Sequence, residues 1–390
     1  MRYGMPYKGS KNKIAKWVID SLPPAENFYD LFCGGCAVTH AAMLSEKYHN
    51  FYINDINESP LLFLKAVSGQ LTEEKRWISR DDFYRLKDSD IYAAVVWSFG
   101  NNLKNYMYSK EIEPWKKALH YARVYGDTSL FGEMGIDTDG SREDIKKHLS
   151  VYKEKYIRWY LKEIKKILPA DIEPLIEQNK AQIKTEEDEL RKYLRDALDR
   201  SGLTQTEVDR RLGTLMSRHY FGKSQWEFPT EDVYKKMQEF MSLEKNYNEI
   251  IGLYKLRQSL ESLQRLQSLQ SLQSLERLQR LQSLQSLESL ERLQSLERLQ
   301  VSVGDYGNVK MKPNSIIYCD IPYKDTDDYG MHFDYERFYD WAKRQSELVV
   351  ISEYGMPNDG FEEFSNTKRM TTLCGGKAKR TIEKLFVAKK

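Results

Sequence analysis

The chain has 390 residues, of which 41% are hydrophobic and 12% aromatic, enough to bury a sizeable core in roughly two or three domains. Its 60 Lys and Arg against 58 Asp and Glu leave a net charge of +2, which excludes a polycationic tail or an acidic solvating protein. No apolar run approaches the roughly 20 residues of a membrane span, the amino terminus lacks a signal-peptide pattern, and cysteines number only 4. We therefore expect a soluble, intracellular protein without a disulfide framework.

The amino-terminal residues have the pattern of an α/β fold. An apolar-aromatic run at 27–32 predicts a strand that ends in a Gly-Gly turn, small residues at 37–45 predict a helix, and 51–55 predict a second strand. Near the other end, the continuous apolar runs SIIYC and LVVIS are typical of parallel strands buried on both faces. Further strands are thus expected at 315–319, 348–352 and 384–388.

The long middle of the chain is charged and mostly helical in pattern. Residues 153–168 and 186–198 show apolar side chains at helical spacing. A helix-rich insert between two pieces of one sheet is the simplest arrangement. We therefore predict a discontinuous domain formed by 1–66 and 301–390, an inserted region at 67–258, and a separate repeat at 259–300.

The repeat consists of triplets of Ser or Arg, then Leu, then Gln or Glu, from Ser259 to Gln300. Its residue types favour an α-helix, although a period of three winds the leucines around a helix with about 3.6 residues per turn. A solenoid with turns in multiples of three is the alternative. We expect a long α-helix, which serves either as a tolerated spacer or as an arm for self-association.

A glycine-rich segment follows the first predicted strand: Tyr29-Asp30-Leu31-Phe32-Cys33-Gly34-Gly35-Cys36-Ala37. One interpretation is a Cys-x-x-Cys redox pair, and another is small residues that pack a helix on a sheet. A third is a nucleotide-binding loop, in which missing side chains let the backbone approach a ligand. Asp55 ends the next strand about twenty residues on, where an acid binds a ribose diol in Rossmann-like sites, and this favours the third.

A second constellation, Asp320-Ile321-Pro322-Tyr323, follows the strand at 315–319. An aromatic amine is a poor nucleophile because its lone pair is delocalised into the ring. The Asp320 carboxylate and the Ile321 carbonyl can accept hydrogen bonds from such an amine and draw its nitrogen towards a tetrahedral geometry. Tyr323 offers a face on which an unstacked base can lie. A surface turn that ends a strand is the alternative interpretation.

Together these motifs resemble the Dam-type (class D12) DNA adenine-N6 methyltransferases. Asp-Ile-Pro-Tyr is similar to the Asp-Pro-Pro-Tyr motif of amino-group DNA methyltransferases, and residues 30–37 to their S-adenosylmethionine loop. Residues 6–11, Pro-Tyr-Lys-Gly-Ser-Lys, resemble the amino-terminal motif of the class. The order of the motifs also matches. The resemblance implies a Rossmann-like methyltransferase sheet with a long, mostly helical target-recognition insert.

The resemblance also implies roles for single residues. Residues of the catalytic motif would be Asp320, Ile321, Pro322 and Tyr323. Residues that would bind S-adenosylmethionine are Tyr7, Lys11, Asp30, Phe32, Cys33, Gly34, Gly35, Asp55 and Asp305, although Asp305 is equally interpreted as an acid that caps a turn. Cys36 and Ile321 depart from the family pattern, where Gly and Pro are usual. No metal is expected, because the His and Cys residues lack ligand spacing.

Double-stranded DNA is the expected partner. Residues 203–213 resemble the first helix and turn of a helix-turn-helix, and a second helix from about Leu215 would then face DNA. A solvated basic hairpin is the alternative. The candidate contacts are Arg210, Arg211, Arg218, His219, Lys223 and Gln225. Acid-free stretches at 3–19 and 368–382 flank the expected site, as phosphate contacts should.

The sequence therefore predicts a site-specific methyltransferase that moves a methyl group from S-adenosylmethionine to the N6 amine of an adenine flipped out of duplex DNA. Cytosine-N4 methylation is the nearest alternative, because the same tetrapeptide serves either amine. A catalytically weakened DNA-binding protein and an interaction protein built on the leucine repeat are alternatives of another class. A bacterial or phage cytoplasm and a restriction-modification setting follow from the resemblance alone.

Overall fold

The computed structural model describes residues 3–222, 226–248, 250, 259–263, 272–284, 296–323, 333–357, 360–372 and 378–389. The chain divides into two compact units. The first combines Met1–Tyr108 with Leu272–Lys390, and the second is Ser109–Ser271. Both sequence regions that carry the candidate motifs therefore fold into the first unit.

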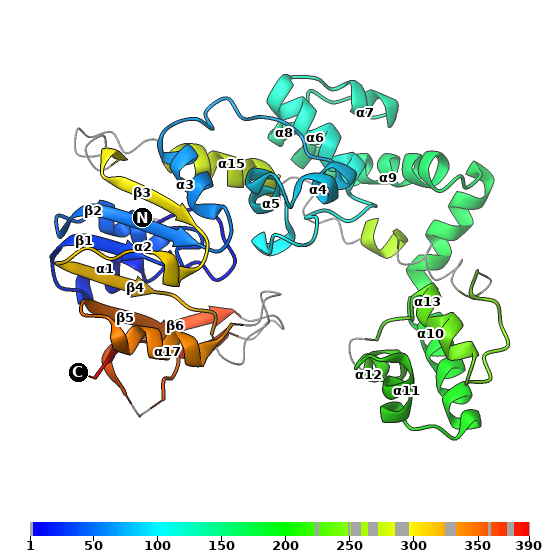
Figure 1. Ribbon diagram of the computed structural model, residues 1–390. Coiled ribbons are helices and arrows are strands. Elements are labelled where there is room, and N and C mark those ends of the chain that lie inside the picture. Colours follow the sequence, from blue (N-terminus) through cyan, green and yellow to red (C-terminus); the bar gives the residue numbers. More distant parts are fainter. Residues whose placement is uncertain are drawn as a thin grey trace. The chain divides into compact units, whose positions relative to one another are not determined.

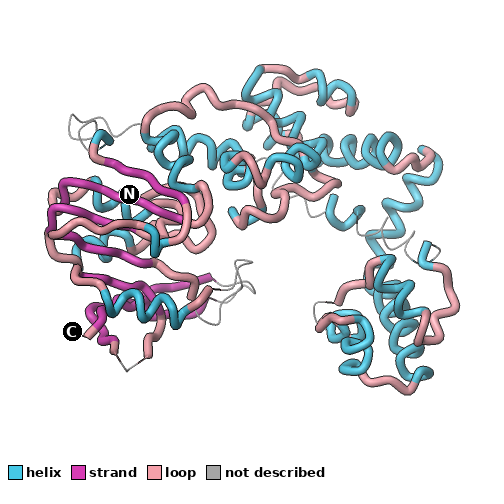
Figure 2. Tube along the Cα trace, in the orientation of Figure 1, coloured by secondary structure: helices cyan, strands magenta, loops and turns pink. Residues whose placement is uncertain are grey.

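The first unit is built on a mixed sheet with the strand order β3-β2-β1-β4-β5-β7-β6 (Figures 1 and 2). Strand β1 pairs in parallel with both β2 and β4, whereas β7 is antiparallel to β5 and β6. The sheet confirms the predicted α/β class. Its strands are β1 (Ala25–Asp30), β2 (Tyr48–Asp55), β3 (Leu299–Val303), β4 (Ser315–Cys319), β5 (Leu348–Glu353), β6 (Phe361–Thr372) and β7 (Ala378–Ala388).

Helices cover both faces of this sheet, because alternate residues of each buried strand point to opposite sides. On one face, Tyr29 and Ile317 pack in a core with Phe338 of α17. On the other, Asp30 accepts a hydrogen bond from Thr39 of α2. The helices of the unit are α1 (Ala15–Ser21), α2 (Ala37–Met43), α3 (Ser59–Val67), α4 (Arg80–Leu86), α5 (Ile91–Val96), α15 (Gln273–Ser283) and α17 (Tyr335–Arg344).

The strand order reverses between β1 and β4. From β1 the sheet continues to β2 and β3, and from β4 to β5 in the opposite direction. In open α/β sheets, ligands bind beyond the carboxyl ends of the strands at such a switch point. The loop after Asp30 and the turn that begins at Asp320 are therefore brought together at the place where this architecture forms its sites.

Two strands were not predicted from the sequence. Strand β6 is mostly exposed over residues 361–368 and lacks the apolar run that marks a buried strand. Strand β3 includes Leu299 and Gln300, the last residues of the triplet repeat, and pairs with β2. The boundary expected between residues 300 and 301 thus falls inside a strand.

The expectation of one long helix over the repeat is wrong for its described part. Helix α15 ends at Ser283, and Leu299 already belongs to β3. Helix α15 packs against α3 and α5 within the first unit (Figure 1). Its Leu278 and Leu281 are buried, so these leucines already have a partner surface inside the chain.

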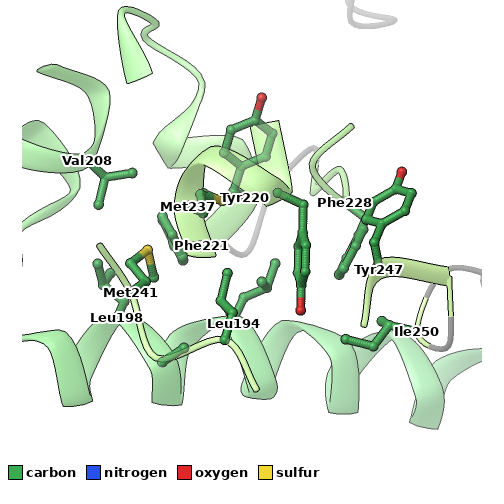
Figure 3. Close-up of a cluster of buried hydrophobic side chains, with 13 residues drawn as sticks. Leu194, Leu198, Val208, Tyr220, Phe221, Phe228, Met237, Met241, Tyr247 and Ile250 are labelled. Carbon is green, nitrogen blue, oxygen red and sulfur yellow. The ribbon is translucent and has the colours of Figure 1, made fainter. Parts of the chain in front are cut away.

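The second unit is helical in its described secondary structure. Its helices are α6 (Glu113–Tyr125), α7 (Ser129–Glu133), α8 (Arg142–Lys147), α9 (Leu149–Trp159), a π-helical turn (Tyr160–Ile164), α10 (Pro169–Ser201), α11 (Gln205–Leu212), α12 (Ser217–Phe221) and α13 (Glu231–Gln238). The helix predicted at 153–168 corresponds to α9 and the π-helical turn, which end four residues earlier at Ile164, and the helix predicted at 186–198 falls in α10. Figure 3 shows an apolar cluster in which Leu194 and Leu198 of α10 meet Val208, Phe221 and Met237.

Candidate active site

The glycine-rich loop leaves β1 at Asp30 and enters α2 at Ala37. Gly34 and Cys36 both have left-handed backbone conformations, with φ of +46° and +54°. A side chain makes this conformation costly, which is a physical reason for glycine at such a position. Cys36 at the N-cap of α2 therefore has a strained backbone, which is the cost of a Cys at a position where Gly is usual. Its Sγ lies 3.4 Å from that of Cys33, and both thiols are free and buried.

Tyr7 lies against this loop. A Cβ added at Gly34 would meet the Tyr7 ring at 3.1 Å, and one at Gly35 would meet the Tyr7 Cβ at 2.7 Å. Asn57 donates from Nδ2 to the Tyr7 hydroxyl at 2.7 Å. The amino-terminal motif and the glycine loop, which lie apart in sequence, therefore form one surface.

Asp55 faces the same loop from the end of β2. Its Oδ2 accepts the Gly34 N–H at 2.8 Å, and its Oδ1 accepts the Asn57 Nδ2 at 2.8 Å. Burial is the largest cause that raises the pKa of Asp55. Asn57, which holds both Asp55 and Tyr7, was not identified from the sequence. Its position two residues after the acid was the only available signal.

Asp30 is the most deeply buried acid of the site. Its Oδ2 accepts the Thr39 hydroxyl at 2.6 Å, whereas its buried Oδ1 has no hydrogen-bond partner among the described residues. Burial, and after it the charges of Asp320 and Asp55, together raise the pKa of Asp30 to about 7, although the hydrogen bond from Thr39 opposes them. Three carboxyl groups within electrostatic range and one unpartnered oxygen fit a cationic ligand such as the sulfonium and ammonium groups of S-adenosylmethionine.

Asp320 lies at the carboxyl end of β4 and forms an ion pair with Lys11, in which Nζ is 2.8 Å from Oδ1. The Lys11 side chain is 8% exposed, so this pair is shielded from water. The same Nζ lies 4.3 Å from the centre of the Tyr323 ring. Lys11 therefore contacts the acid and the aromatic of the tetrapeptide together, and Ile321 between them is 1% exposed.

The Tyr323 ring is fixed from two further strands. Its hydroxyl is 3.0 Å from the Ser352 Oγ of β5 and donates to the Glu383 carboxylate of β7 at 2.9 Å. Pro322 accepts a hydrogen bond at its carbonyl from the Tyr335 hydroxyl. Ser352 and Glu383 were not identified from the sequence, because only the pairing of β5 with β7 brings them to the site.

Two predicted cofactor residues have other partners in the structure. Asp305 accepts the Gly307 N–H and forms a bidentate ion pair with Arg337, with both distances 2.8 Å. This is the arrangement of an acid that caps a turn. The Phe32 ring packs edge-on against Phe338 at 5.7 Å, inside the core beneath α17. Cofactor contact for both residues stays a prediction.

The expected helix-turn-helix residues lie in α11 and α12. Thr204 caps α11 by accepting the Glu207 N–H, and Gly213 ends it with φ of +65°. Helix α12 begins at Ser217, later than predicted, and spans only 5 residues. Candidate side chains that are exposed or half-buried are Arg210, Arg211, Arg218 and His219, whereas Lys223 and Gln225 lie outside the described residues. Arg210 and Arg211 pair with Glu207.

Neither a metal cluster nor a spanning helix is found in the described parts of the chain. No group of three or more His, Cys, Asp or Glu side chains there is arranged to hold a metal ion. Of the helices in those same ranges, none combines the length and apolar character needed to cross a membrane.

The buried Asp30 carboxyl predicts a specific pH dependence of stability. Its ordinary pKa is 3.8 and its folded pKa about 7, so between these values the unfolded chain ionises first and the folded state loses stability as pH rises, by at most about 4 kcal/mol. Asp30→Asn removes this ionisation. Urea unfolding should show that the free energy of unfolding of the variant, relative to that of the unaltered protein, increases by about 3 kcal/mol from about pH 5 to about pH 8.

The control for this experiment is Asp20→Asn, which alters an exposed carboxyl group. Its stability relative to the unaltered protein should not change with pH over the same range. If the free energy of unfolding of Asp30→Asn differs from that of the unaltered protein by the same amount at every pH, Asp30 is not the source of the pH dependence.

The model of the D12 class N6 adenine-specific DNA methyltransferase family matches residues 7–125, which include Tyr7, Lys11, the glycine loop and Asp55. No curated protein matches the chain. The family implies S-adenosylmethionine as methyl donor and DNA as substrate, and it supports adenine over cytosine as the target. The family match over residues 7–125 therefore supports adenine-N6 methylation of DNA as the enzymatic activity.

Proposed function

We propose that the protein methylates an adenine that is flipped out of duplex DNA onto Tyr323, with Asp320 as the acceptor for its N6 amine. The observation that carries this proposal is the position of the Lys11 ammonium. It donates to Asp320 at 2.8 Å and lies 4.3 Å above the Tyr323 ring, which are the two contacts that a stacked adenine with an exocyclic amine requires. Lys11 therefore occupies the place of the target amine and has to move when the base enters.

The chemistry follows from the acceptors at this place. When bound, S-adenosylmethionine supplies a methyl group on a positively charged sulfur. Asp320 and the Ile321 carbonyl accept the amine hydrogens, which draws the nitrogen lone pair out of the ring and aims it at the methyl carbon. Asp320 and the Ile321 carbonyl would hold the amine while its nitrogen bonds to the methyl carbon and the sulfur leaves as a neutral thioether. The methylated nitrogen would then lose one proton to the Asp320 carboxylate or to water.

The residues that would hold the methyl donor surround the glycine loop. Asp55 would exchange its present hydrogen bonds with Gly34 and Asn57 for those of the ribose hydroxyls. The carboxyl group of Asp30, with one oxygen unpartnered, would favour the positive end of the donor. Tyr7 closes the loop from the amino-terminal side.

DNA contacts are proposed on the basic residues of the helical hairpin. Arg218 is exposed on α12, where Tyr220 and Phe221 are buried and fix the orientation of the helix. Arg210, Arg211 and His219 complete the described set, while Lys223 and Gln225 stay predictions from sequence. Phosphate contacts from such residues would make DNA binding weaken with salt.

An assay with labelled methyl donor tests the proposal. The protein is incubated with S-adenosylmethionine labelled in its methyl group and with duplex DNA, and the DNA is digested to nucleosides. Label in N6-methyladenine supports the proposal, and label in N4-methylcytosine supports the alternative target. Binding of the donor without any labelled nucleoside would favour the third candidate, a catalytically weakened DNA-binding protein.

Removal of the Tyr323 ring tests the stacking role. Stacking of a base on an aromatic ring contributes about 1–3 kcal/mol, so Tyr323→Ala should lower kcat/KM by roughly 10- to 100-fold. Tyr323→Phe keeps the face and loses only the bonds to Ser352 and Glu383, so it should retain most of the activity. Equal losses in both variants, measured by the same methylation assay, would contradict a stacking role.

Other expectations stay predictions. Self-association through the repeat would be seen by analytical ultracentrifugation of the full chain. Leu278 and Leu281 of α15 are buried within the first unit, which leaves fewer apolar side chains for that purpose. Cytoplasmic location and a restriction partner are expectations from the resemblance.

A further inference from the structure

Helix α15 is the part of the triplet repeat that packs inside the first unit (Figure 1). Its leucines fill space against α3 and α5, but its polar side chains do something more specific. Arg277, Arg280 and Gln282 each donate to backbone carbonyl groups of distant segments. A segment that looks like a uniform repeat in sequence thus makes distinct contacts at successive triplets.

Arg277 donates hydrogen bonds at the carboxyl end of helix α5. Its Nη1 donates to the Val96 carbonyl at 2.8 Å and to the Ser98 carbonyl at 2.7 Å. The last carbonyls of a helix lack intrahelical partners, so this side chain satisfies the Val96 carbonyl, which the helix itself cannot. At the Ser98 carbonyl it adds a second donor beside the Asn101 N–H. Its contacts lie away from the glycine loop, and its role is stabilisation of the fold.

Arg280, one triplet later, donates hydrogen bonds to the amino-terminal segment. Its Nη2 donates to the Tyr3 carbonyl at 3.1 Å and to the Gly4 carbonyl at 3.2 Å. Gly4 is in direct contact with the glycine loop, since a Cβ at this position would lie 2.3 Å from the Gly35 oxygen. Met5 then donates its N–H to that same oxygen at 2.7 Å.

The amino-terminal segment is what delivers Tyr7 to the loop. Gly4 is held by Arg280 at its carbonyl and by the His40 Nδ1 at its N–H, the latter at 3.0 Å. From this anchor the chain runs through Met5 to Tyr7, whose ring and Cβ pack on Gly34 and Gly35. A shift of the anchor is therefore transmitted to both sides of the loop.

The sequence of the repeat specifies this placement. Within residues 259–300, two consecutive triplets that begin with Arg occur once, at Arg277 and Arg280. A slip of one triplet in either direction places Ser274 or Ser283 opposite one pair of carbonyls, and a serine is too short to replace the guanidinium. The paired arginines fix the register of an otherwise repetitive helix.

We propose that Arg280 is a positioning residue for the S-adenosylmethionine loop, and that the repeat thereby contributes to cofactor binding. The proposal rests on the proposed function, because it assigns the glycine loop to that cofactor. Arg280 acts through Gly4 and Tyr7 and does not itself touch the cofactor. Its neighbour Arg277, with the same triplet and the same type of contact, serves stability alone.

Three matched substitutions in Arg-Leu-Gln triplets test this assignment: Arg280→Gln, Arg277→Gln and, as a control, Arg298→Gln at an exposed position. The full-length proteins are compared by isothermal titration with S-adenosylmethionine and by thermal unfolding. Loss of a charged hydrogen-bond donor predicts that Arg280→Gln raises the dissociation constant about tenfold. Arg277→Gln should lower the Tm with an unchanged dissociation constant, and Arg298→Gln should change neither.

The conservative variant Arg280→Lys keeps a donor and should recover part of the affinity, and it serves as the test protein if Arg280→Gln does not fold. A lowered Tm without a change in dissociation constant at position 280 would overturn the proposal, as would equal affinity losses at positions 277 and 280. If the unaltered protein binds no S-adenosylmethionine, the proposed function fails first, and this inference fails with it.

Discussion

Replacement of Asp320 with Asn should lower kcat for DNA methylation by about 10²–10³-fold, the loss typical when one preorganised group is removed from a polar transition state. The amine nitrogen gains positive charge as its bond to the methyl carbon forms. A carboxylate stabilises that charge, whereas a neutral amide of the same shape only accepts a hydrogen bond. Because the interaction strengthens in the transition state, the loss should fall on kcat more than on KM.

Asp320→Asn also removes the ionic partner of Lys11, a side chain only 8% exposed. Thermal unfolding and titration with S-adenosylmethionine should therefore accompany the methylation assay. The matched control is Asp20→Asn, which breaks an exposed pair with Lys16 at the same 2.8 Å distance and should retain full activity. Retention of more than about a tenth of kcat in Asp320→Asn would refute the assignment of the amine acceptor.

The core of the site could be predicted from sequence because its signals are local. Asp30, the two glycines and Asp55 occupy strand ends and a turn within one short stretch, and Asp320 directly follows a buried strand. Each signal is a property of a few adjacent residues. Parallel pairing of β1 with β4 then brings the two stretches together, as the α/β pattern predicts.

The residues that orient this core could not be predicted. Glu383 reaches the Tyr323 hydroxyl only because β7 runs antiparallel next to β5, a choice that the sequence of the strand does not indicate. The placement of Asp305 shows the same limit, since Arg337 pairs with it from a helix packed on the sheet. Long-range partners of this kind depend on the completed topology.

The prediction of one long helix for the triplet repeat failed for another reason. Its period fits neither a standard α-helix nor a strand, and composition was used in place of period to predict one long helix. In the structure, residues of the same repeat form both α15 and the start of β3. Tertiary contacts made by individual side chains, Arg277 and Arg280 above all, outweighed the regularity of the sequence.

Gly35→Ala should weaken S-adenosylmethionine binding by roughly 10- to 100-fold, because it separates the two segments that form the loop surface. A Cβ at this position would lie 2.7 Å from the Tyr7 Cβ and 2.9 Å from the Met5 carbonyl oxygen. Both atoms are fixed to the main chain, so a rotamer change cannot relieve the contact. The amino-terminal segment must move as a whole, at a cost of about 1–3 kcal/mol in the free energy of unfolding.

The control Gly132→Ala places the same methyl group in α7, where no heavy atom lies within 4 Å. This variant should bind the cofactor normally and be as stable as the unaltered protein or slightly more so. Titration of both variants separates a specific effect at the loop from a general effect of added bulk. Normal affinity in Gly35→Ala would mean that the contact between Tyr7 and the loop is not required for cofactor binding, and that Asp30 and Asp55 suffice to hold it.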